Sequence, residues 1–431
     1  MPEAFATSAF QTISQLAALP QVHRTFQWFH LQEPKLRDWH RRVAAIPAPT
    51  FGEAARARWV AEQFTALGLE DVQVDACGNV LGWLRGISEE DAAAGLTRNH
   101  GHEPSAYRPC TLFSAHLDTV FPVEAIREPI QDDSRLLCPG ASDNCAGITA
   151  LLALAAAMQS AELRPATDIL FAGNVCEEGE GNLAGMRSLF TESPFASRIR
   201  SAVVLDGAGT ESIIAQGLGS KRFRVTITGP GGHSWSDAGT PNPILALAHA
   251  LTAVAKIALP PTPRTTWNVG HIEGGTSINA IPQSAQARID TRSTDAALLL
   301  QLEEEIRRAV KDVVAEANQA AAASARGMSD GPLRFQIETI GERPAARLQE
   351  DAGILSTLRA VDRHLGIQSQ LRIASTDANI PLSLGIEAVS IGGGGSGGGI
   401  HTREEWFDAN GRDLALRRIL LLLLAVAQAE L

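Results

Sequence analysis

The spacing of apolar residues changes several times along the first half of the chain. Residues 1–70 carry apolar side chains at helical spacing, as in RARWVAEQFTALGL, which predicts a series of helices that ends near Gly68. The alternating segment DVQVDACGNVLGWLRG predicts a strand hairpin with Gly78 and Asn79 at its turn. Three short apolar runs follow, CTLFSAHLD, TDILFAGNV and SAVVLD, with an apolar helix at residues 146–160 between the first two. Strands that alternate with helices predict an α/β fold with a mostly parallel sheet.

The pattern changes again at about residue 217. Strand, helix, strand, strand, helix and strand follow one another, and this β-α-β-β-α-β order predicts a ferredoxin-like sandwich. The apolar run AVSIGG at residues 388–393 then predicts a further buried strand of the first kind. We therefore expect one domain formed by residues 1–216 and 343–431, with residues 217–342 inserted into it as a second domain.

Composition narrows the class of protein and of partner. The chain has 431 residues, 45% hydrophobic and 20% charged, which is ordinary for a soluble globular protein with two cores. Its net charge of −11 argues against a broad phosphate-binding surface, so we expect no nucleic acid partner. The five cysteines show no CxxC spacing, which favours a reducing compartment. The N-terminus lacks the basic and apolar segments of a signal peptide, so a cytoplasmic location is expected.

Two apolar segments need to be distinguished from membrane spans. Residues 144–161 are uncharged over nearly the length of a span, but they are rich in alanine and include Asn144, Gln159 and Ser160. The leucine-rich segment at residues 419–425 is too short to cross a bilayer. We predict a buried core helix at each segment and no membrane partner.

Carboxylates and histidines follow the predicted parallel strands at the points where these strands end. In such sheets ligands bind beyond the carboxyl ends of the strands. Taken singly, each residue has an ordinary explanation, such as a chance HxD pair, a solvated pair of glutamates or an Asp-Gly turn. Together, several unpaired carboxylates would repel one another, and a bound multivalent cation would stabilise them. The set comprises His116, Asp118, Asp143, Glu177, Glu178, Asp206 and His401.

The mixture of ligand types indicates the metal. Imidazoles together with carboxylates favour zinc over calcium or magnesium, which prefer oxygen ligands alone. Five candidate ligands are too many for one tetrahedral zinc with an open position. They fit two Zn²⁺ ions about 3.5–4 Å apart that share one carboxylate, with Co²⁺ or Mn²⁺ as alternatives. Cys145 and Cys176 flank Asp143 and Glu177, and we expect them to be small packing residues.

A run of seven glycines and one serine precedes Ile400 and His401. Such a run is typical of a flexible tether. It is also what a backbone needs when it approaches a ligand closely or adopts conformations that a Cβ would forbid. The composition of the run does not choose between the two.

Eight motifs occur in the order and spacing of one family. The chain thereby resembles the co-catalytic zinc exopeptidases and deacylases, which include peptidase T, glutamate carboxypeptidase, acetylornithine deacetylase, succinyl-diaminopimelate desuccinylase and aminoacylase. The resemblance implies a zinc-hydrolase catalytic domain with a mostly parallel sheet, and an inserted ferredoxin-like lid and dimerisation domain. The motifs are SAHLDTV, GASDNCAG, CEEGEG, VVLDGAG, GPGGHSW, NAIP, DTRS and GGIHTREEW.

The resemblance also implies a role for each residue of the set. Glu177 would be the general base in the hydrolysis of an amide, and Asp118 would orient His116, two residues before it on the same strand face. With His401 as a ligand, the glycines would let its loop pack tightly beside the site, so a mobile tether is the less favoured explanation. The implied ligands are His116 and Asp206 for one zinc, Glu178 and His401 for the other, and Asp143 between the two.

The resemblance extends to the inserted domain and to assembly. His233 would bind the substrate carbonyl, and Asn279 and Arg292 would hold a substrate carboxylate. Alternatively, His233 simply follows a glycine-rich turn and Arg292 is a surface strand residue. We expect a homodimer in which His233 completes the site of the neighbouring subunit, although some relatives are monomers. The resemblance also implies a cis peptide bond between Asp143 and Asn144.

The leading hypothesis is a zinc exopeptidase that acts on short peptides, and the alternative is an N-acyl amino acid deacylase with the same site. An inactive binding protein is disfavoured because neither Glu177 nor any ligand is missing. A dinuclear phosphoesterase is disfavoured by the acidic balance. The polar insertion at residues 87–108 and the long glycine run depart from the family pattern beside the expected substrate entrance, which leaves substrate choice open. His100 and His102 in that insertion are expected to lie in a solvated loop.

Overall fold

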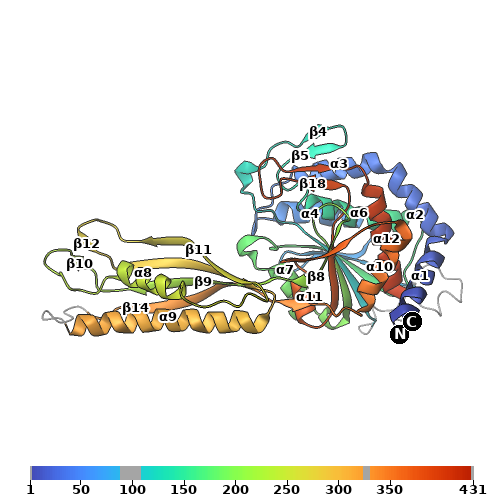
Figure 1. Cartoon of the computed structure of the whole chain (residues 1–431). Coiled ribbons are helices and arrows are strands. Elements are labelled where there is room, and N and C mark those ends of the chain that lie inside the picture. The colour runs from blue at the N-terminus through green and yellow to red at the C-terminus, as the bar shows by residue number, and fades with distance from the viewer. Residues whose placement is uncertain (1, 88–107, 324–330, 429–431) are drawn as a thin grey trace. The chain divides into compact units, whose positions relative to one another are not determined.

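The computed structural model describes residues 2–87, 108–323 and 331–428 (Figure 1). Most of the predicted insertion at residues 87–108, with His100 and His102, lies outside the described residues. The chain divides into two compact units. The larger unit comprises Met1–Gly217 and Arg347–Leu431, and the inserted unit comprises Leu218–Ala346.

The larger unit contains a nine-stranded sheet whose centre is parallel, as the sequence predicts. Strand β3 lies between β6 and β7, and β7 pairs in parallel with β17. The hairpin of β1 and β2 adds antiparallel strands at one side, and β8 adds one at the other. In sheet order the strands are β1 (Glu70–Val74), β2 (Val80–Leu84), β6 (Asp168–Asn174), β3 (Cys110–His116), β7 (Ile199–Leu205), β17 (Glu387–Ile391), β8 (Ser212–Gly217) and β15 (Ala346–Arg347), with β16 (Gln370–Ala374) paired to β8.

Helices pack on this sheet and form the hydrophobic core of the larger unit together with it. Every residue of α6 from Cys145 to Met158 is buried, because the helix packs on β3 and β7 and against α2, α3, α4 and α12. Residues 419–424 of α12 are also buried, so both apolar segments are core helices, as predicted. None of the helices in the described parts of the chain combines the length and the apolar character needed to span a bilayer. The helices are α1 (Pro2–Ala17), α2 (Pro20–Leu31), α3 (Glu33–Ala44), α4 (Ala54–Ala66), α6 (Cys145–Ser160), α7 (Ala184–Thr191), α10 (Gly353–Leu365), α11 (Asn379–Ser383) and α12 (Arg412–Gln428), with short 3₁₀ turns η1 (Val123–Ala125), η2 (Gly179–Gly181) and η3 (Ala196–Arg198).

A small antiparallel sheet, which the hydrophobic pattern does not predict, joins two distant segments of the larger unit. Part of the glycine run forms one of its strands and pairs with the strand that follows His401. Its strands, in order, are β18 (Ser396–Gly398), β19 (Trp406–Asp408), β5 (Arg135–Leu137) and β4 (Ile130–Asp132).

The inserted unit has the predicted β-α-β-β-α-β order and the antiparallel sheet β11-β13-β9-β14. Alternating burial along β9 and β13 presents one apolar face, against which α8 and α9 pack. The side chains of Asn242 and Asp295 cap these two helices by accepting backbone N–H bonds. The elements are β9 (Gly219–Thr228), β10 (Gly232–His233), α8 (Pro243–Val254), β11 (Thr265–Gly274), β12 (Ala280–Ile281), β13 (Ser284–Ser293), α9 (Ala296–Ala322) and β14 (Arg334–Arg343).

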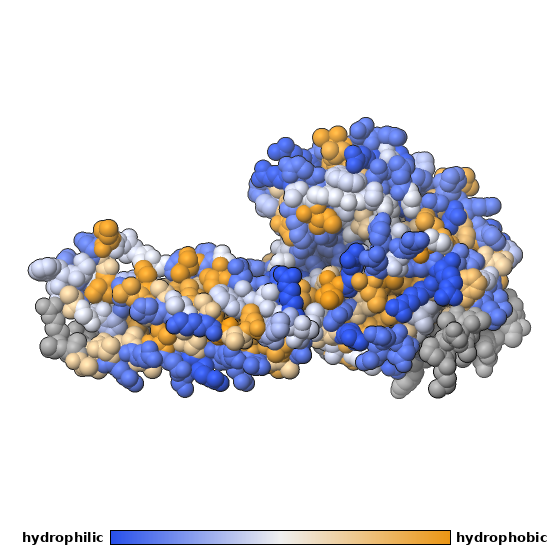
Figure 2. Space-filling view, in the orientation of Figure 1, coloured by the Kyte–Doolittle hydropathy of each residue, from blue (hydrophilic) through white to orange (hydrophobic). Residues whose placement is uncertain are grey.

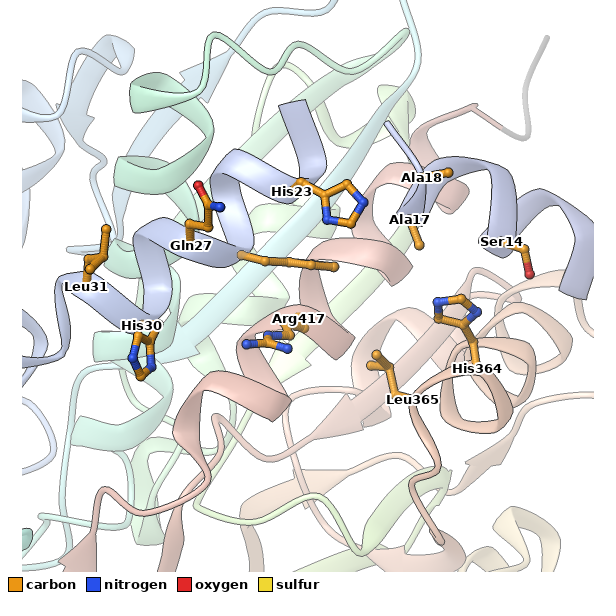
Figure 3. A pocket seen from close by; sticks show the side chains of 11 residues that line it. Ser14, Ala17, Ala18, His23, Gln27, His30, Leu31, His364, Leu365 and Arg417 are labelled. Carbon is orange, nitrogen blue, oxygen red and sulfur yellow. The ribbon is translucent and has the colours of Figure 1, made fainter. Parts of the chain in front are cut away.

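A surface cleft of about 920 Å³ lies among α1, α2, α10 and α12 of the larger unit. Its lining includes His23, His364 and Arg417, which come from three different helices (Figure 3). Among the residues that the structure describes, none lines both this cleft and the strand ends where the sequence predicts a site.

Candidate metal centre

The ends of three neighbouring parallel strands bring the predicted site residues together. Strand β3 ends at His116, β6 leads into Glu177 and Glu178, and β7 ends one residue before Asp206. Because β3 pairs with both β6 and β7, the loops after these strands lie at one edge of the sheet. Asp143 lies two residues before Cys145, the first residue of α6.

Six side chains of the described chain form three overlapping groups that could hold metal ions. His116 Nε2 lies 3.0 Å from Asp143 Oδ1 and 3.7 Å from Asp206 Oδ1. His401 Nε2 lies 3.1 Å from Asp143 Oδ2 and 3.0 Å from Glu178 Oε1. The two oxygens of Asp143 therefore face two different histidines. Within each group the ligand atoms lie within 4.8 Å of one another.

The electrostatics of this cluster suit a cation. Hydrogen bonds that His401 donates to the carboxylates of Asp143 and Glu178 raise the pKa of His401 to about 10. Burial lowers the pKa of His116, but its carboxylate partners outweigh burial and raise that pKa well above the usual value. Burial would raise the pKa of Asp143, whereas its hydrogen bonds to the two histidines hold it well below the usual range. Two imidazoles and three carboxylates in this arrangement fit divalent metals of the zinc type.

Asp118 links the loop of Glu177 and Glu178 to His116. It is fully buried, and its carboxylate accepts the backbone N–H groups of Glu177, at 2.9 Å, and Glu178, at 2.8 Å. Its Oδ1 lies 3.6 Å from His116 Nδ1, and its backbone carbonyl lies 3.1 Å from the same nitrogen. Asp118 therefore fixes the loop of the two glutamates as well as adjoining His116. The peptide bond between Asp143 and Asn144 is cis, as the resemblance predicts.

The glycine run is packed tightly, so it is not a mobile tether. A Cβ on Gly393 would lie 2.7 Å from the carbonyl oxygen of Ala146, and one on Gly398 would lie 2.9 Å from the Trp406 ring. The run thereby lets the chain pass close to the start of α6 and deliver His401 to the cluster.

Left-handed backbone conformations concentrate around the site. Of the eight non-glycine residues with positive φ in the described chain, five lie in the loops that carry or adjoin the cluster. Such conformations persist where surrounding contacts enforce them, and they are most common at functional sites. The five are Phe51, Cys176, Asn182, Leu183 and His401.

Glu405, which is absent from the predicted set of site residues, holds the loop of Asp143 in place. This fully buried carboxylate accepts backbone N–H groups from Gly140, Ser142 and Asp143, each at 2.8 Å. Burial raises the pKa of Glu405 to about 7, against the opposing effect of these hydrogen bonds. The only sequence signal is its place in the GGIHTREEW motif, because its three partners are more than 260 residues away in the chain.

We predict that Glu405→Gln loosens the Asp143 loop. The amide NH₂ would face a buried backbone N–H, and an unsatisfied buried donor costs about 1–3 kcal/mol. Loss of such a supporting partner typically weakens metal binding about 10–100-fold. Thermal unfolding and a Co²⁺ titration would measure both effects, with exposed Glu404→Gln as the matched control. Unchanged cobalt affinity would contradict the proposed support.

A second buried group supports the same loop from α3. His40 is 1% exposed, its Nε2 donates to the carbonyl of Ala141 at 2.7 Å, and its Nδ1 accepts from Arg412 at 3.3 Å. Burial, reinforced by the charge of Arg412, lowers the pKa of His40 to about 3. His40 is therefore neutral in the folded protein at any pH above that value.

The lowered pKa of His40 leads us to predict that the folded protein loses stability in acid. Between its folded pKa of about 3 and the usual unfolded value of about 6.5, only the unfolded chain binds the proton. Stability should therefore fall as pH decreases through this window, by up to about 1.4 kcal/mol per pH unit from this group. Urea unfolding measured at pH 7 and at pH 5 should show that the free energy of unfolding falls less in His40→Gln than in wild type. The variant His364→Gln, at an exposed histidine, should lose as much as wild type. Equal losses in all three proteins would contradict the prediction.

In the inserted unit the structure brings two of the three predicted substrate residues together. His233 pairs with Ala280 between the short strands β10 and β12, and the backbone N–H of Ser234 donates to the carbonyl of Asn279 at 3.0 Å. Arg292 lies elsewhere, near the far end of β13, where its Nε donates to Asp290 Oδ2 at 2.8 Å. His233 and Asn279 thus share one tip of the unit, and Arg292 does not.

Comparisons with known proteins agree with this architecture. Residues 218–318 match the peptidase dimerisation domain, and residues 100–222 match peptidase family M28. The uncharacterised protein YqjE of Bacillus subtilis is 23% identical over 389 residues, 87% of this chain and 94% of that protein. A probable carboxypeptidase of Aspergillus terreus is 30% identical over 222 residues, 47% of this chain and 49% of its own length.

Among solved structures, aminopeptidase PepT of Bacillus cereus has the same fold. The TM-score is 0.68 at 19% identity, with 91% of this chain and 98% of PepT covered. The resemblance drawn from the motifs is thereby confirmed. The two matched peptidase domains and the shared fold support the similarity to the co-catalytic exopeptidases and deacylases, and they support a hydrolase that acts on amide bonds.

Proposed function

We propose that this protein is an exopeptidase that hydrolyses the amide bond of short peptides at a site for two Zn²⁺ ions. The observation that carries the proposal is the position of Asp143, whose two oxygens lie 3.0 Å and 3.1 Å from two different histidine nitrogens. A carboxylate between two sets of ligands is what a pair of metal ions needs for a shared bridge.

His116 and Asp206 would hold one ion, Glu178 and His401 the other, and Asp143 both. When bound, the two ions would polarise the substrate carbonyl and lower the pKa of a water molecule at the site. Zinc suits this mixture of imidazole and carboxylate, and Co²⁺ or Mn²⁺ are the alternatives.

Glu177 would act as the general base. Its side chain is 5% exposed, and its backbone is held by Asp118 at 2.9 Å, so the carboxylate is kept near the ligands and away from bulk water. It would accept the proton of the attacking water and then deliver it to the leaving nitrogen. Of the three ligand groups in the described chain, Glu177 belongs only to the one with His116 and Glu178 and to neither of the two that contain Asp143.

The inserted unit would bind substrate and a second subunit. His233 would donate a hydrogen bond to the substrate carbonyl. Asn279, at the same tip, and Arg292, near the far end of β13, would hold a substrate carboxylate from two different subunits of a dimer. The outer strands β11 and β14 of its sheet each have one unpaired edge within the described sheet. Such edges can pair in a closed twofold dimer, in which His233 would reach the neighbouring site.

Metal analysis combined with a hydrolysis panel tests this proposal. Protein stripped with a chelator and reloaded should take up two ions per subunit and cleave dipeptides or tripeptides. A marked preference for N-acyl amino acids would identify the deacylase alternative instead. Protein that holds two zinc ions and cleaves none of these substrates would overturn the proposed function.

A further inference from the structure

An exposed aromatic residue lies beside the metal centre without a structural reason to be there. Phe51 is 70% exposed and has a φ of 70°. A bulky residue with positive φ is a genuine conformational outlier. An exposed ring contributes little packing to the core. Neither local backbone preference nor the core therefore accounts for a phenylalanine at this position.

The turn that carries Phe51 is fastened to the loops of the metal centre. The hydroxyl of Thr50 donates to Asp118 Oδ2 at 3.0 Å. The backbone N–H of Phe51 donates to Glu53 Oε1 at 3.1 Å, and the same oxygen accepts the N–H of Cys176, directly before Glu177. These contacts enforce the left-handed conformation and hold Phe51 next to the site.

Two further exposed apolar residues adjoin the centre from other segments. Val120 is 41% exposed and lies two residues after Asp118, and Ile400 is 48% exposed and directly precedes His401. The backbone of Thr119 donates to the carbonyl of Ala48 at 2.9 Å, so the segments of Val120 and Phe51 run side by side. Figure 2 shows that apolar patches interrupt the mainly hydrophilic surface of the larger unit on the face that is turned to the viewer.

We propose that Phe51, together with Val120 and Ile400, forms an apolar subsite that contacts a large apolar side chain next to the scissile amide. The substrates would then be peptides or N-acyl amino acids that carry leucine, methionine or phenylalanine at this position. Apolar surface gains free energy when it leaves water, so an exposed apolar rim around a polar centre selects an apolar substrate group. This inference rests on the proposed amide hydrolysis and adds its substrate class.

Substitution of Phe51 separates specificity from folding. Asparagine tolerates the left-handed conformation but lacks the apolar ring. Phe51→Asn should keep or raise the melting temperature, while it lowers kcat/KM for Ala-Leu, Leu-Ala or N-acetyl-leucine about tenfold relative to the alanine counterparts. Phe51→Leu should retain the preference. Leu31→Asn is the matched control, because Leu31 is also 70% exposed and lines the cleft of α1, α2, α10 and α12.

Binding without turnover provides a second readout. In the Glu177→Gln background, calorimetry should show that Phe51→Asn weakens binding of the leucine substrate and leaves the alanine substrate unchanged. Equal handling of leucine and alanine substrates by wild type would overturn the subsite, and so would a uniform loss on all substrates with a lowered melting temperature. In both cases amide hydrolysis itself would stand. Failure of metal-loaded wild type to cleave any substrate would instead refute the proposed function.

Discussion

Replacement of Glu177 by glutamine is expected to lower kcat by about 10²–10⁴-fold while both metal ions remain bound. The amide has nearly the shape of the carboxylate but cannot accept the proton of a water molecule. The ligand groups around Asp143 do not include Glu177, so the bridge should persist. The hydrogen bond that Asp118 accepts from Glu177 uses the backbone N–H, which the substitution leaves in place.

Metal content, melting temperature and turnover should be measured on the same preparation. The exposed Glu180→Gln, in the same loop, is the matched control and should retain wild-type turnover. Wild-type-like turnover of Glu177→Gln with two ions bound would remove this residue from the mechanism.

Mixing two inactive variants is expected to restore activity. If His233 serves the neighbouring subunit, a heterodimer of Glu177→Gln and His233→Ala has one site that contains both intact residues. Random reassortment of subunits makes half of the dimers mixed, so about a quarter of all sites should become active. The recovery should therefore stand far above the residual turnover of either variant alone.

The matched control mixes Glu177→Gln with His401→Ala. Both residues belong to the larger unit, so neither site of that heterodimer would be complete and no activity should return. Affinity tags on each variant would verify that subunits have exchanged. Exchange without recovery would contradict the shared site, and a monomer in sedimentation would contradict the dimer.

The fold follows from the sequence where the hydrophobic pattern is strong. The continuous apolar runs of β3, β6 and β7 are buried in the sheet. A run of this kind is typical of a buried parallel strand and can be recognised from the local sequence alone. The β-α-β-β-α-β order of the inserted unit is equally clear because β9 and β13 alternate regularly. The segment of α10, β16 and α11 and the small sheet of β18 and β19 were not predicted. Their short strands, some of them glycine-rich, form only because partners from other parts of the chain complete them.

For the candidate site, the sequence by itself determined which side chains end or follow the parallel strands. Strand periodicity and the rule that parallel strands end at one edge were sufficient to group His116, Glu178 and Asp206. Asp143 and His401 were placed in the same set although neither ends a strand of this sheet, and their particular roles as ligands came from the motif resemblance.

Only the tertiary structure decided what holds those residues. Glu405 reaches the Asp143 loop, and Glu53 joins Phe51 to Cys176, through contacts between segments more than 120 residues apart. A carboxylate's partners are backbone N–H groups, which every residue except proline carries, so no sequence pattern marks them. The conformation of the glycine run was likewise decided by neighbours that are distant in sequence. Its composition allows a tether or a close approach, and the neighbouring backbone of α6 and ring of Trp406 made it the latter.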